Sequence, residues 1–489
     1  MSLSDEGTVE QIILLARLAL ERGEEDGAVA EVEAGAAQYR DARLWQWTGL
    51  LRRALEETGG AIAAFGEASR LAPDDAGIAH GLARVLFEGG CDARAAYARA
   101  RALAPADGDV LVGETAARMA QGDGNRAAAE LGDLVSQNPL WVQGHFQLAQ
   151  LVALLGYPAL ATRSLDEALA RNPGDVGLWR ALIDLAVRRG AFEELQEVAA
   201  RAGHAGLPPE EVRLASAIAA TELGAIAQAD SLFGALPADV APIWRIRHLL
   251  RSGRAIEALP LIDRDVASER GAAAWPYALA AWRLVGDARA IWLAGNDGFV
   301  RVVDLADRLP DLDGLAEVLR HIHRTGGQFL DQSVRGGSQT DGPLFSRIEP
   351  AIRAVRAAIV DAVGEYRAAL PAPDPRHPLL GPARNRPVRF AGSWSIRLGG
   401  GGHHANHVHP QGWVSSALYI SLPVAGEGDA GWLTLGEPQA ELELGLSPTH
   451  RIEPRPGRLV LFPAWMWHGT IPFETGERLT IAFDVARPR

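Results

Sequence analysis

The stretch HHANHVHPQGWVSSALYISL, residues 403–422, joins closely spaced histidines to a run of apolar and hydroxyl-bearing residues. His407 and His409 stand two residues apart just ahead of that run, at the expected entrance to a strand. Because side chains alternate between the two faces of a strand, both imidazoles are predicted to leave the same face. Two rings on one face lie near enough to share an ion, so this segment predicts a metal site.

A third histidine and an arginine follow downstream. His468 lies in PGRLVLFPAWMWHGTIPF, residues 456–473, directly after an apolar run that is expected to be a core strand. Three imidazoles that leave coordination positions open suit iron(II) that binds and activates oxygen. Ten residues past His468, Arg478 begins RLTIAFDV. A buried arginine there can hold a carboxylate through two parallel hydrogen bonds. Taken alone, Arg478 would fit a surface strand end, but its position after His468 favours the buried interpretation.

Short β-type segments surround these residues and are separated by turns. They are residues 388–398, 413–424, 431–435, 450–454, 457–463, 469–473 and 478–485. Several short strands at close spacing are typical of a barrel or sandwich. Upstream, residues 299–309 predict a strand and a turn, whereas residues 311–324 and 344–370 predict helices. The Pro-rich residues 370–387 predict a connector.

Two Gly-rich segments are expected to be loops. In FLDQSVRGGSQTDGP, residues 329–343, the glycines beside Arg335 would let a ligand approach closely, with a plain surface loop as the alternative. GGGGHHAN, residues 399–406, predicts a flexible approach to the metal pair. That loop position disfavours both His403 and His404 as ligands, although His403 shares the parity of His407.

His321 and His323 provide an internal control for the metal pair. They have the same spacing as His407 and His409 but fall in a predicted helix. A two-residue step rotates a helical side chain by about 200°, so these rings are expected to point apart. The pair therefore predicts no metal site.

Further side chains are candidates for the cavity around the metal. Ser416 and Tyr419 follow the histidine pair on the same predicted strand, and a hydroxyl there can help bind a carboxylate. A tyrosine that only lines the barrel fits equally well. Trp394 and Arg397 on an adjacent strand are expected to line the cavity or to pack at its rim. Two tryptophans ahead of His468 are predicted to be wall and core residues: Trp465 and Trp467.

Residues 388–489 resemble the 2-oxoglutarate/iron(II) oxygenases that are often found behind tetratricopeptide repeats. The resemblance rests on HVHPQGWVSSALYI, PGRLVLFPAWMWHGTIPF and ERLTIAFDV, and QSVRGGSQTDGPLF extends it to roughly residues 296–489. It implies a double-stranded β-helix (jelly-roll or cupin-like) domain whose cofactors are Fe(II), 2-oxoglutarate and O2. It also implies that His407, His409 and His468 hold the iron and that Arg478 takes the distal carboxylate of 2-oxoglutarate. Such enzymes oxidise 2-oxoglutarate to succinate and hydroxylate a C–H bond.

His409 departs from the usual superfamily motif, in which an aspartate or glutamate stands at this place. A neutral third ligand leaves iron one charge more positive, although three-histidine iron sites serve thiol dioxygenases and the resembling family includes the HxH form. Two alternatives stay open: a cupin-type three-histidine dioxygenase or isomerase without 2-oxoglutarate, in which Arg478 has no required role, and a non-catalytic repeat scaffold whose β-barrel binds a ligand. Aspartyl/asparaginyl hydroxylases also lack the metal carboxylate, but their wider motifs are not found here.

The first part of the chain is Ala/Leu-rich and repeats. Glycines recur at steps of 32, 34, 34 and 34 residues and prolines at steps of 32, 34 and 34: Gly90, Gly122, Gly156, Gly190 and Gly224; Pro73, Pro105, Pro139 and Pro173. A period of 34 residues is that of tetratricopeptide arrays. Glycine permits the turn between paired helices, small residues let the helices approach, and proline ends the second helix. Beyond Gly224 the steps become 29 and 33, which predicts degenerate helical pairs.

Length and composition complete the expectations. A chain of 489 residues exceeds one hydrophobic core, and we expect an α+β multidomain protein with a helical-repeat α-solenoid at 1–295 and the β-helix domain at 296–489. A net charge of −13 disfavours nucleic acid as a partner. The acidic start, residues 1–23, predicts an amphipathic helix rather than a signal peptide, and no membrane span is expected. These features favour a cytoplasmic enzyme whose repeat groove selects a protein or peptide partner.

Overall fold

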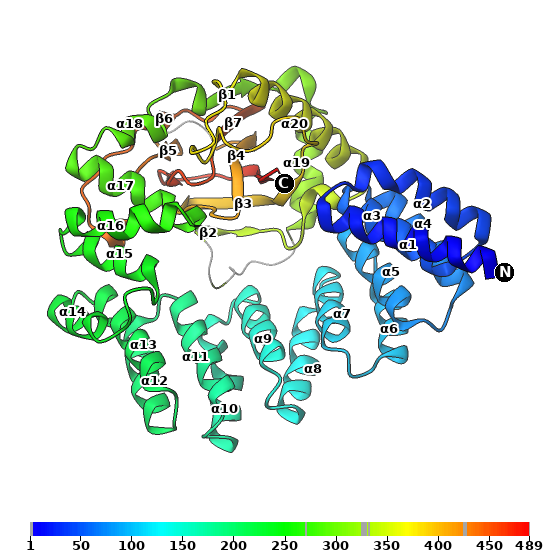
Figure 1. The fold of residues 1–489 in the computed structure, drawn as a ribbon, viewed down its shortest axis with the longest axis horizontal. Helices are drawn as coiled ribbons and strands as arrows, with labels where there is room; N and C mark the ends of the chain where they lie inside the picture. Colours follow the sequence, from blue (N-terminus) through cyan, green and yellow to red (C-terminus); the bar gives the residue numbers. More distant parts are fainter. Residues whose placement is uncertain (1–2, 269–270, 324–329, 331–332, 424–427, 489) are drawn as a thin grey trace.

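The computed structural model describes the whole chain except residues 1–2, 269–270, 324–329, 331–332, 424–427 and 489 (Figure 1). In the described part of residues 3–294, helices joined by turns curve around a β-sheet domain that lies in the rest of the chain. The predicted fold class is confirmed: an all-helical repeat region precedes an antiparallel β domain. None of the helices in the described residues is both long and apolar enough to cross a membrane.

The repeat region consists of helices that follow one another in antiparallel pairs. They are α1 (Leu3–Arg22), α2 (Glu25–Tyr39), α3 (Ala42–Ala54), α4 (Thr58–Leu71), α5 (Ala76–Glu88), α6 (Arg94–Leu103), α7 (Gly108–Ala120), α8 (Gly124–Gln137), α9 (Val142–Leu154), α10 (Arg163–Arg171), α11 (Val176–Arg188), α12 (Phe192–His204), α13 (Pro209–Glu222), α14 (Ile226–Gly234), α15 (Pro242–Arg251), α16 (Ala255–Val266), α17 (Trp275–Val285) and α18 (Arg289–Ala294). The helix expected at residues 1–23 is α1, and the degenerate pairs expected beyond Gly224 are α15–α16 and α17–α18.

The repeat lattice has the predicted physical basis. All five periodic glycines have positive φ, between 65° and 90°, in the turns that follow helices. Gly49 allows a close helix approach, since a Cβ there would lie 2.5 Å from the Phe65 ring. Each periodic proline directly follows the C-cap of a second helix, as Pro73 follows Ala72 after α4.

The β domain contains two antiparallel sheets. The larger has the order β1-β7-β4-β9-β3-β2 and the smaller has the order β6-β5-β8. The strands are β1 (Arg301–Asp304), β2 (Val334–Gln339), β3 (Phe390–His404), β4 (Gly412–Ser421), β5 (Leu433–Leu435), β6 (His450–Ile452), β7 (Arg458–Pro463), β8 (His468–Thr470) and β9 (Arg478–Ala486). Two further helices are α19 (Leu312–Ile322) and α20 (Pro350–Ala369).

Side-chain alternation gives the larger sheet two different faces. Residues such as Leu418 of β4 and Ile481 of β9 are fully buried in a core with α19 and α20. The opposite face carries Tyr419 and Val460, which share a second core with the smaller sheet and with α15–α18. This face contains the predicted site, so the last helices of the repeat region form part of its support.

Two loop predictions are wrong. Within residues 329–343, the described part contains β2, which pairs with β3; residues 329, 331 and 332 lie outside the described residues. The GGGG segment is also not a loop, because β3 continues through it to His404. Backbone pairing stabilises both segments despite their lack of apolar alternation. Glycine is required at 337, where a Cβ would lie 2.3 Å from the Arg397 carbonyl oxygen.

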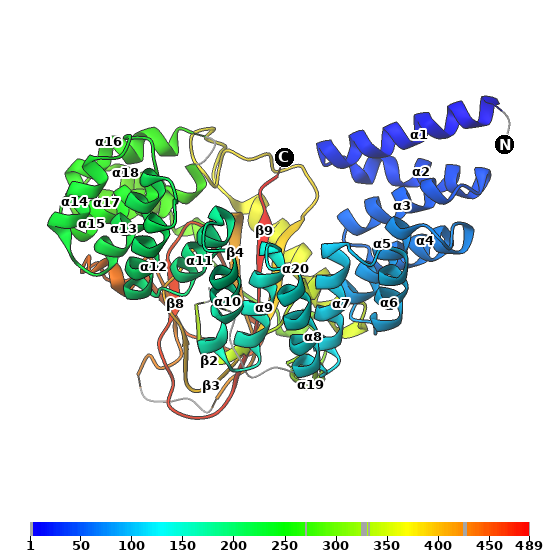
Figure 2. The same cartoon turned by 90° about the horizontal axis from the view of Figure 1, so that it is seen from below.

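The repeat region touches the β domain at both of its ends (Figures 1 and 2). Near the N-terminus, Glu56 forms a 2.6 Å ion pair with Arg356 of α20 and accepts a hydrogen bond from the Phe390 amide of β3. At the other end, Arg247 of α15 donates to Gln439 at 2.8 Å, and Arg283 of α17 donates to the Ser447 carbonyl at 2.7 Å. The helices between these ends form an arc that spans the β domain, as the two views show.

Candidate metal centre

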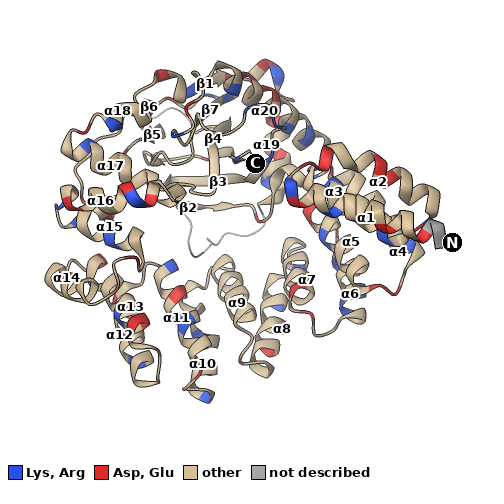
Figure 3. Ribbon diagram, in the orientation of Figure 1, with Lys and Arg blue, Asp and Glu red and all other residues tan. Residues whose placement is uncertain are grey.

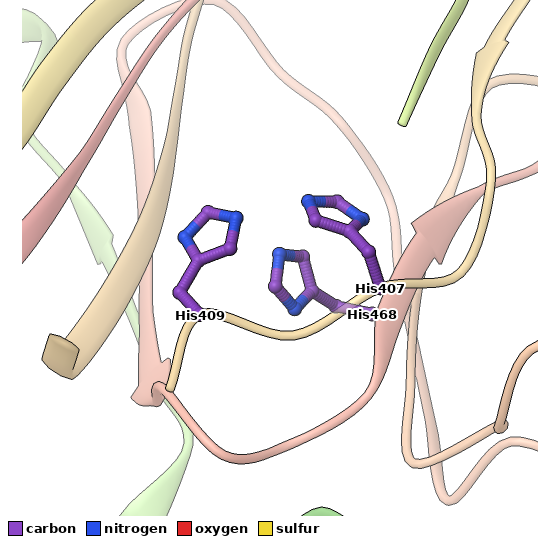
Figure 4. A group of neighbouring side chains, drawn as sticks. All are labelled: His407, His409 and His468. Atoms are coloured by element: carbon purple, nitrogen blue, oxygen red, sulfur yellow. The ribbon is translucent and has the colours of Figure 1, made fainter. Parts of the chain in front are cut away.

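The side chains of His407, His409 and His468 lie close together (Figure 4). His407 and His409 precede β4 of the larger sheet, and His468 begins β8 of the smaller sheet. One possible ligand atom from each lies within 4.8 Å of the others, and no other such three-residue group was found in the described residues. Backbone hydrogen bonds fix this arrangement. The His407 and His468 backbones pair in both directions, at 2.9 and 3.0 Å, and the His409 amide donates to the Ala464 carbonyl at 3.1 Å.

Each imidazole is oriented by a hydrogen bond at Nδ1. His407 Nδ1 contacts the Ala405 carbonyl at 2.9 Å, and His468 Nδ1 contacts the Met466 carbonyl at 3.0 Å. Since a carbonyl only accepts, both nitrogens carry the proton, and each Nε2 keeps its lone pair. This is the pattern expected for metal-binding histidines, whose second nitrogen sets the tautomer and the ring orientation.

His409 has a different second partner, a carboxylate. Its Nδ1 lies 2.7 Å from one oxygen of Asp484 and 2.8 Å from the other. Asp484 is itself buried and accepts a hydrogen bond from the Ser415 hydroxyl. Position 409 therefore lacks a negative charge of its own, but the Asp484 carboxylate supplies one through a hydrogen bond to His409. A carboxylate in this position makes a metal-binding imidazole more basic.

Burial keeps two of the three rings neutral. Desolvation, together with the neighbouring histidines, lowers the pKa of His407 and of His468 well below the ordinary value of 6.5. Neutral imidazole is the form that ligates metals. Aromatic rings shield the cluster, because Trp394 lies 5.4 Å from the His409 ring and Phe462 lies 4.8 Å from the His468 ring. The centre is therefore prepared for a cation without competing protons on these two rings at neutral pH.

Arg478 lies in the same cavity and is 3% exposed. Its Nη1 donates to the Gly431 carbonyl at 2.7 Å, and its guanidinium lies 4.9 Å from the centre of the Tyr419 ring. Burial lowers the pKa of Arg478 and raises that of Tyr419. Arg478 Nε and the Tyr419 hydroxyl are both buried, and neither makes a hydrogen bond of normal geometry. The two side chains are nevertheless close enough that the guanidinium lowers the pKa of Tyr419 and the phenol raises the pKa of Arg478, each against the larger effect of burial. Among the described residues, no carboxylate pairs with Arg478. Burial of an unpaired guanidinium costs desolvation free energy, and an anionic ligand bound beside Arg478 would offset that cost.

Other predicted residues divide between the cavity and its surroundings. Trp394 lines the cavity, whereas Arg397 is not among its lining residues and pairs with Glu477 at 2.6 Å, which leaves the rim as the expected alternative for Arg397. The Ser416 hydroxyl donates to the Phe483 carbonyl and accepts from the Phe483 amide, both at 2.9 Å. That hydroxyl has no proton left for a carboxylate. The two tryptophans ahead of His468 pack toward the repeat region: Trp465 and Trp467.

The remaining histidines lie outside the cluster. His404 lines the cavity, where its Nδ1 contacts the Ser333 hydroxyl at 3.1 Å, and burial lowers its pKa to about 3. His403 is 3.3 Å from the Gly401 carbonyl. His323 lies between the hydroxyls of Ser338 and Ser395, at 2.9 and 3.0 Å, whereas His321 is exposed on α19.

Two residues of β9 at or behind the cavity were missed by the sequence reasoning. Asp484 orients His409, and Thr480 lines the cavity beside Arg478. Both have the parity of Arg478 along the strand, and side chains two residues apart share a face. Counting in steps of two along the strand from Arg478 would have placed Thr480 and Asp484 on the same face as Arg478.

The chain combines helical repeats with an antiparallel β domain that carries a candidate metal centre. Residues 392–484 match the model of a protein family described as "Putative 2OG-Fe(II) oxygenase". The match spans β3 to β9 and includes all three histidines and Arg478. The C-terminal β domain is thus that of the 2OG-Fe(II) oxygenase family, and the repeat region before it is tetratricopeptide-like.

Solved structures similar to parts of the chain include both kinds of region. A prolyl-4-hydroxylase from Pseudomonas putida is 20% identical, with 43% of this chain and all of that chain covered, at a TM-score of 0.27. A tetratricopeptide repeat protein from Parabacteroides merdae is 14% identical, with 47% and 91% covered, at a TM-score of 0.30. MamA from Desulfovibrio magneticus is 16% identical, with 33% and 93% covered, at a TM-score of 0.30. No curated protein matches the chain.

Proposed function

We propose that this protein is an Fe(II)- and 2-oxoglutarate-dependent hydroxylase whose substrate is selected with the help of its repeat region. The observation that carries the proposal is the joint placement of three convergent imidazoles and one buried guanidinium in a single cavity. The family match supports the same chemistry. We assign metal binding to His407, His409 and His468 and carboxylate binding to Arg478.

The residues fit both groups. Two Nδ1 atoms are bonded to carbonyls and the third to a carboxylate, so the three Nε2 atoms are the ones that can face a cation. His407 Nε2 lies 3.2 Å from the Ser333 hydroxyl, a hydrogen bond that a bound cation would replace. The Arg478 Nε is buried without a normally formed hydrogen bond, and the guanidinium geometry matches a carboxylate. Bound iron(II) and 2-oxoglutarate supply the oxidising chemistry: one atom of O2 enters succinate as CO2 is lost, and the other enters a substrate C–H bond.

The protein's own side chains position and protect the reactants. Arg478 binds the distal carboxylate of 2-oxoglutarate, and the Tyr419 ring holds the guanidinium in place. Asp484 orients His409 and balances charge. Trp394 and Phe462 exclude water around the imidazoles, which strengthens the electrostatic interactions inside the cavity.

The test is the release of succinate from 2-oxoglutarate by purified protein supplied with Fe(II) and O2. We expect His468→Ala and Arg478→Ala each to abolish that release. His321→Ala and Arg397→Ala are matched controls, because they remove the same residue types outside the cavity, and we expect both to retain it. Release that is unchanged by His468→Ala and Arg478→Ala would refute the assignment.

A three-histidine dioxygenase that does not use 2-oxoglutarate is a second candidate, favoured by His409 in place of a carboxylate. Arg478 separates the two functions. If oxygen is consumed without 2-oxoglutarate and Arg478→Ala leaves the rate unchanged, the second function is supported. A non-catalytic scaffold predicts instead that the purified chain binds no divalent metal, even after anaerobic addition of Fe(II).

A further inference from the structure

A chamber of about 950 Å³ lies between the repeat region and the metal centre. Turns that follow α9 and α11, together with α15 and α17, form one wall; the opposite wall comes from β2, the segment before β4 and the 3-10 turn Ala440–Leu442. His407 lines both this chamber and the smaller cavity that holds the other two histidines. The chamber and the proposed iron site therefore adjoin at His407.

The chamber is roofed by an arc that is fixed at both ends. Glu56 ties one end to α20 and β3, and Arg247 and Arg283 tie the other end to the β domain. The second end also shares a hydrophobic core with β4, β5 and β7. Because either end can move only by breaking these contacts, they oppose any lifting of the roof that would admit a folded domain, whose radius of gyration is about 13 Å for 100 residues.

The lining contains aromatic, amide and ion-paired groups. Phe192, Trp244 and Tyr277 each line the chamber and are partly exposed. On the opposite wall, the Asn406 amide nitrogen donates to the Pro438 carbonyl and the Gln439 amide oxygen accepts from Arg247. The other amide atom of each side chain can hydrogen-bond a peptide backbone. Rings and amides on facing walls suit a chain that carries both side chains and backbone polar groups, whereas small-molecule pockets are mostly apolar.

The charges in the chamber are largely neutralised locally. Arg189 pairs with Glu194 at 2.9 Å, and Arg247 pairs with Glu222. Across the molecule, acidic and basic residues are interspersed along the helices (Figure 3). A wall of paired charges gives no strong positive field, so a polyanion such as a nucleic acid is disfavoured as the occupant.

We infer that an extended segment of a partner polypeptide binds in this chamber and presents one side chain to the metal centre beside His407. The inference rests on the proposed function for the reaction, but binding in the chamber is separable from it. The partner segment would thus bind in the chamber between the repeat region and the β domain, beside the turns at Gly156 and Gly190, and not on the repeat surface alone.

The experiment blocks the chamber of the whole chain with a bulky maleimide coupled to an engineered cysteine. Cys91 is the only cysteine in the sequence, so a Cys91→Ser background permits one engineered thiol. Pro158→Cys places that thiol at an exposed position of the chamber wall, and Ala170→Cys places it at an exposed position of α10 away from the chamber. Each protein is compared before and after coupling to a bulky maleimide, so folding is matched within each pair.

Binding is measured by fluorescence anisotropy with a labelled pool of short random-sequence peptides, on protein without added iron. We expect the label at position 158 to weaken binding by at least about tenfold and the label at position 170 to leave it unchanged. Equal binding before and after labelling of Pro158→Cys, or no binding of the pool to the unlabelled protein, would overturn the inference.

Turnover separates this inference from the proposed function. With Fe(II), 2-oxoglutarate and O2, the labelled Pro158→Cys protein should still release succinate without peptide but should lose oxygen transfer to the pool, detected by mass. Peptide hydroxylation that survives the plug would refute the chamber as the binding place. Absence of succinate release from every protein, with peptide binding still sensitive to the plug, would refute the proposed function alone.

Discussion

Two histidine pairs of identical spacing have opposite surroundings. His407 and His409 precede β4 in an extended segment, and their rings lie 4.9 Å apart with His468 close to both. His321 is exposed on α19, while His323, just past that helix, is enclosed by two serine hydroxyls. The comparison teaches that backbone conformation, and not spacing, decides whether an HxH pair can share an ion.

The largest effect should come from breaking the metal cluster. Loss of an imidazole removes one of three ligands, so we expect His468→Ala to weaken Co(II) binding by more than about 100-fold, above the 10–100-fold typical of outer-shell changes. Isothermal titration calorimetry measures the affinity. His321→Ala should bind like the parent, and similar losses in both variants would contradict the distinction between the pairs.

The next effect concerns the carboxylate ligand. Arg478→Met removes a buried cation but keeps a side chain of similar length. Because truncating one member of a buried charge pair costs about 2–5 kcal/mol, the Kd for 2-oxoglutarate on the metal-loaded protein should rise by about 100-fold. Arg397→Met, on the neighbouring strand, is the matched control and should leave this Kd unchanged, since Arg397 pairs with Glu477 outside the cavity.

Asp484 sharpens the comparison, because His409 contacts this carboxylate whereas His323 of the control pair contacts two serine hydroxyls. Asp484→Asn keeps an acceptor for His409 Nδ1 but removes the charge, so we expect metal affinity to fall by about 10–100-fold. Asp361→Asn, at an exposed position of α20, is the control. An unchanged affinity in Asp484→Asn would show that charge behind His409 is not needed.

Moving the charge provides a stricter form of the same test. His409→Asp alone would place two carboxylates together, and their repulsion should disfavour binding. The double variant His409→Asp/Asp484→Asn carries a single charge, now at position 409. It should therefore bind Co(II) more tightly than His409→Asp, and the reverse order would argue against charge compensation by Asp484.

The smallest effect is on the pH dependence of stability. Burial lowers the pKa of His323 to about 4 from an ordinary value of 6.5. The unfolded chain therefore takes up a proton below pH 6.5 that the folded chain does not, and the stability present above pH 6.5 falls as the pH decreases toward 4. At pH 5 the loss from this residue is about 2 kcal/mol.

Urea denaturation at pH 7.5 and pH 5 measures this loss. In His323→Asn, the difference between the two pH values should shrink by about that amount, and His321→Asn, at an exposed position, should not change it. An identical pH dependence in the parent and in His323→Asn would contradict the burial of a neutral ring.

Local pattern made most of the fold predictable. The repeat helices follow from glycine and proline steps, and strands such as β7 and β9 follow from apolar composition with turn residues around them. β2, with the sequence VRGGSQ, could not be found this way, because its strand conformation depends on pairing with β3. The same long-range pairing turns the glycines before His403 from an expected loop into strand.

The clustering of the candidate ligands was predictable, but their surroundings were not. His407, His409, His468 and Arg478 follow from strand alternation and the family motifs, whereas Asp484 required the alternation to be carried along β9. The chamber depends on where the repeat arc docks, and contacts such as Glu56–Arg356 join residues 300 positions apart in the sequence. No local pattern encodes such contacts.

The central claim is that His409 ligates the metal although it replaces a carboxylate. The most direct measurement is a crystal structure of protein loaded anaerobically with Fe(II) and N-oxalylglycine. We expect Nε2 of His407, His409 and His468 on the iron, with His409 Nδ1 on Asp484 and the ligand carboxylate on Arg478. Iron held without His409, or a carboxylate bound away from Arg478, would contradict the account.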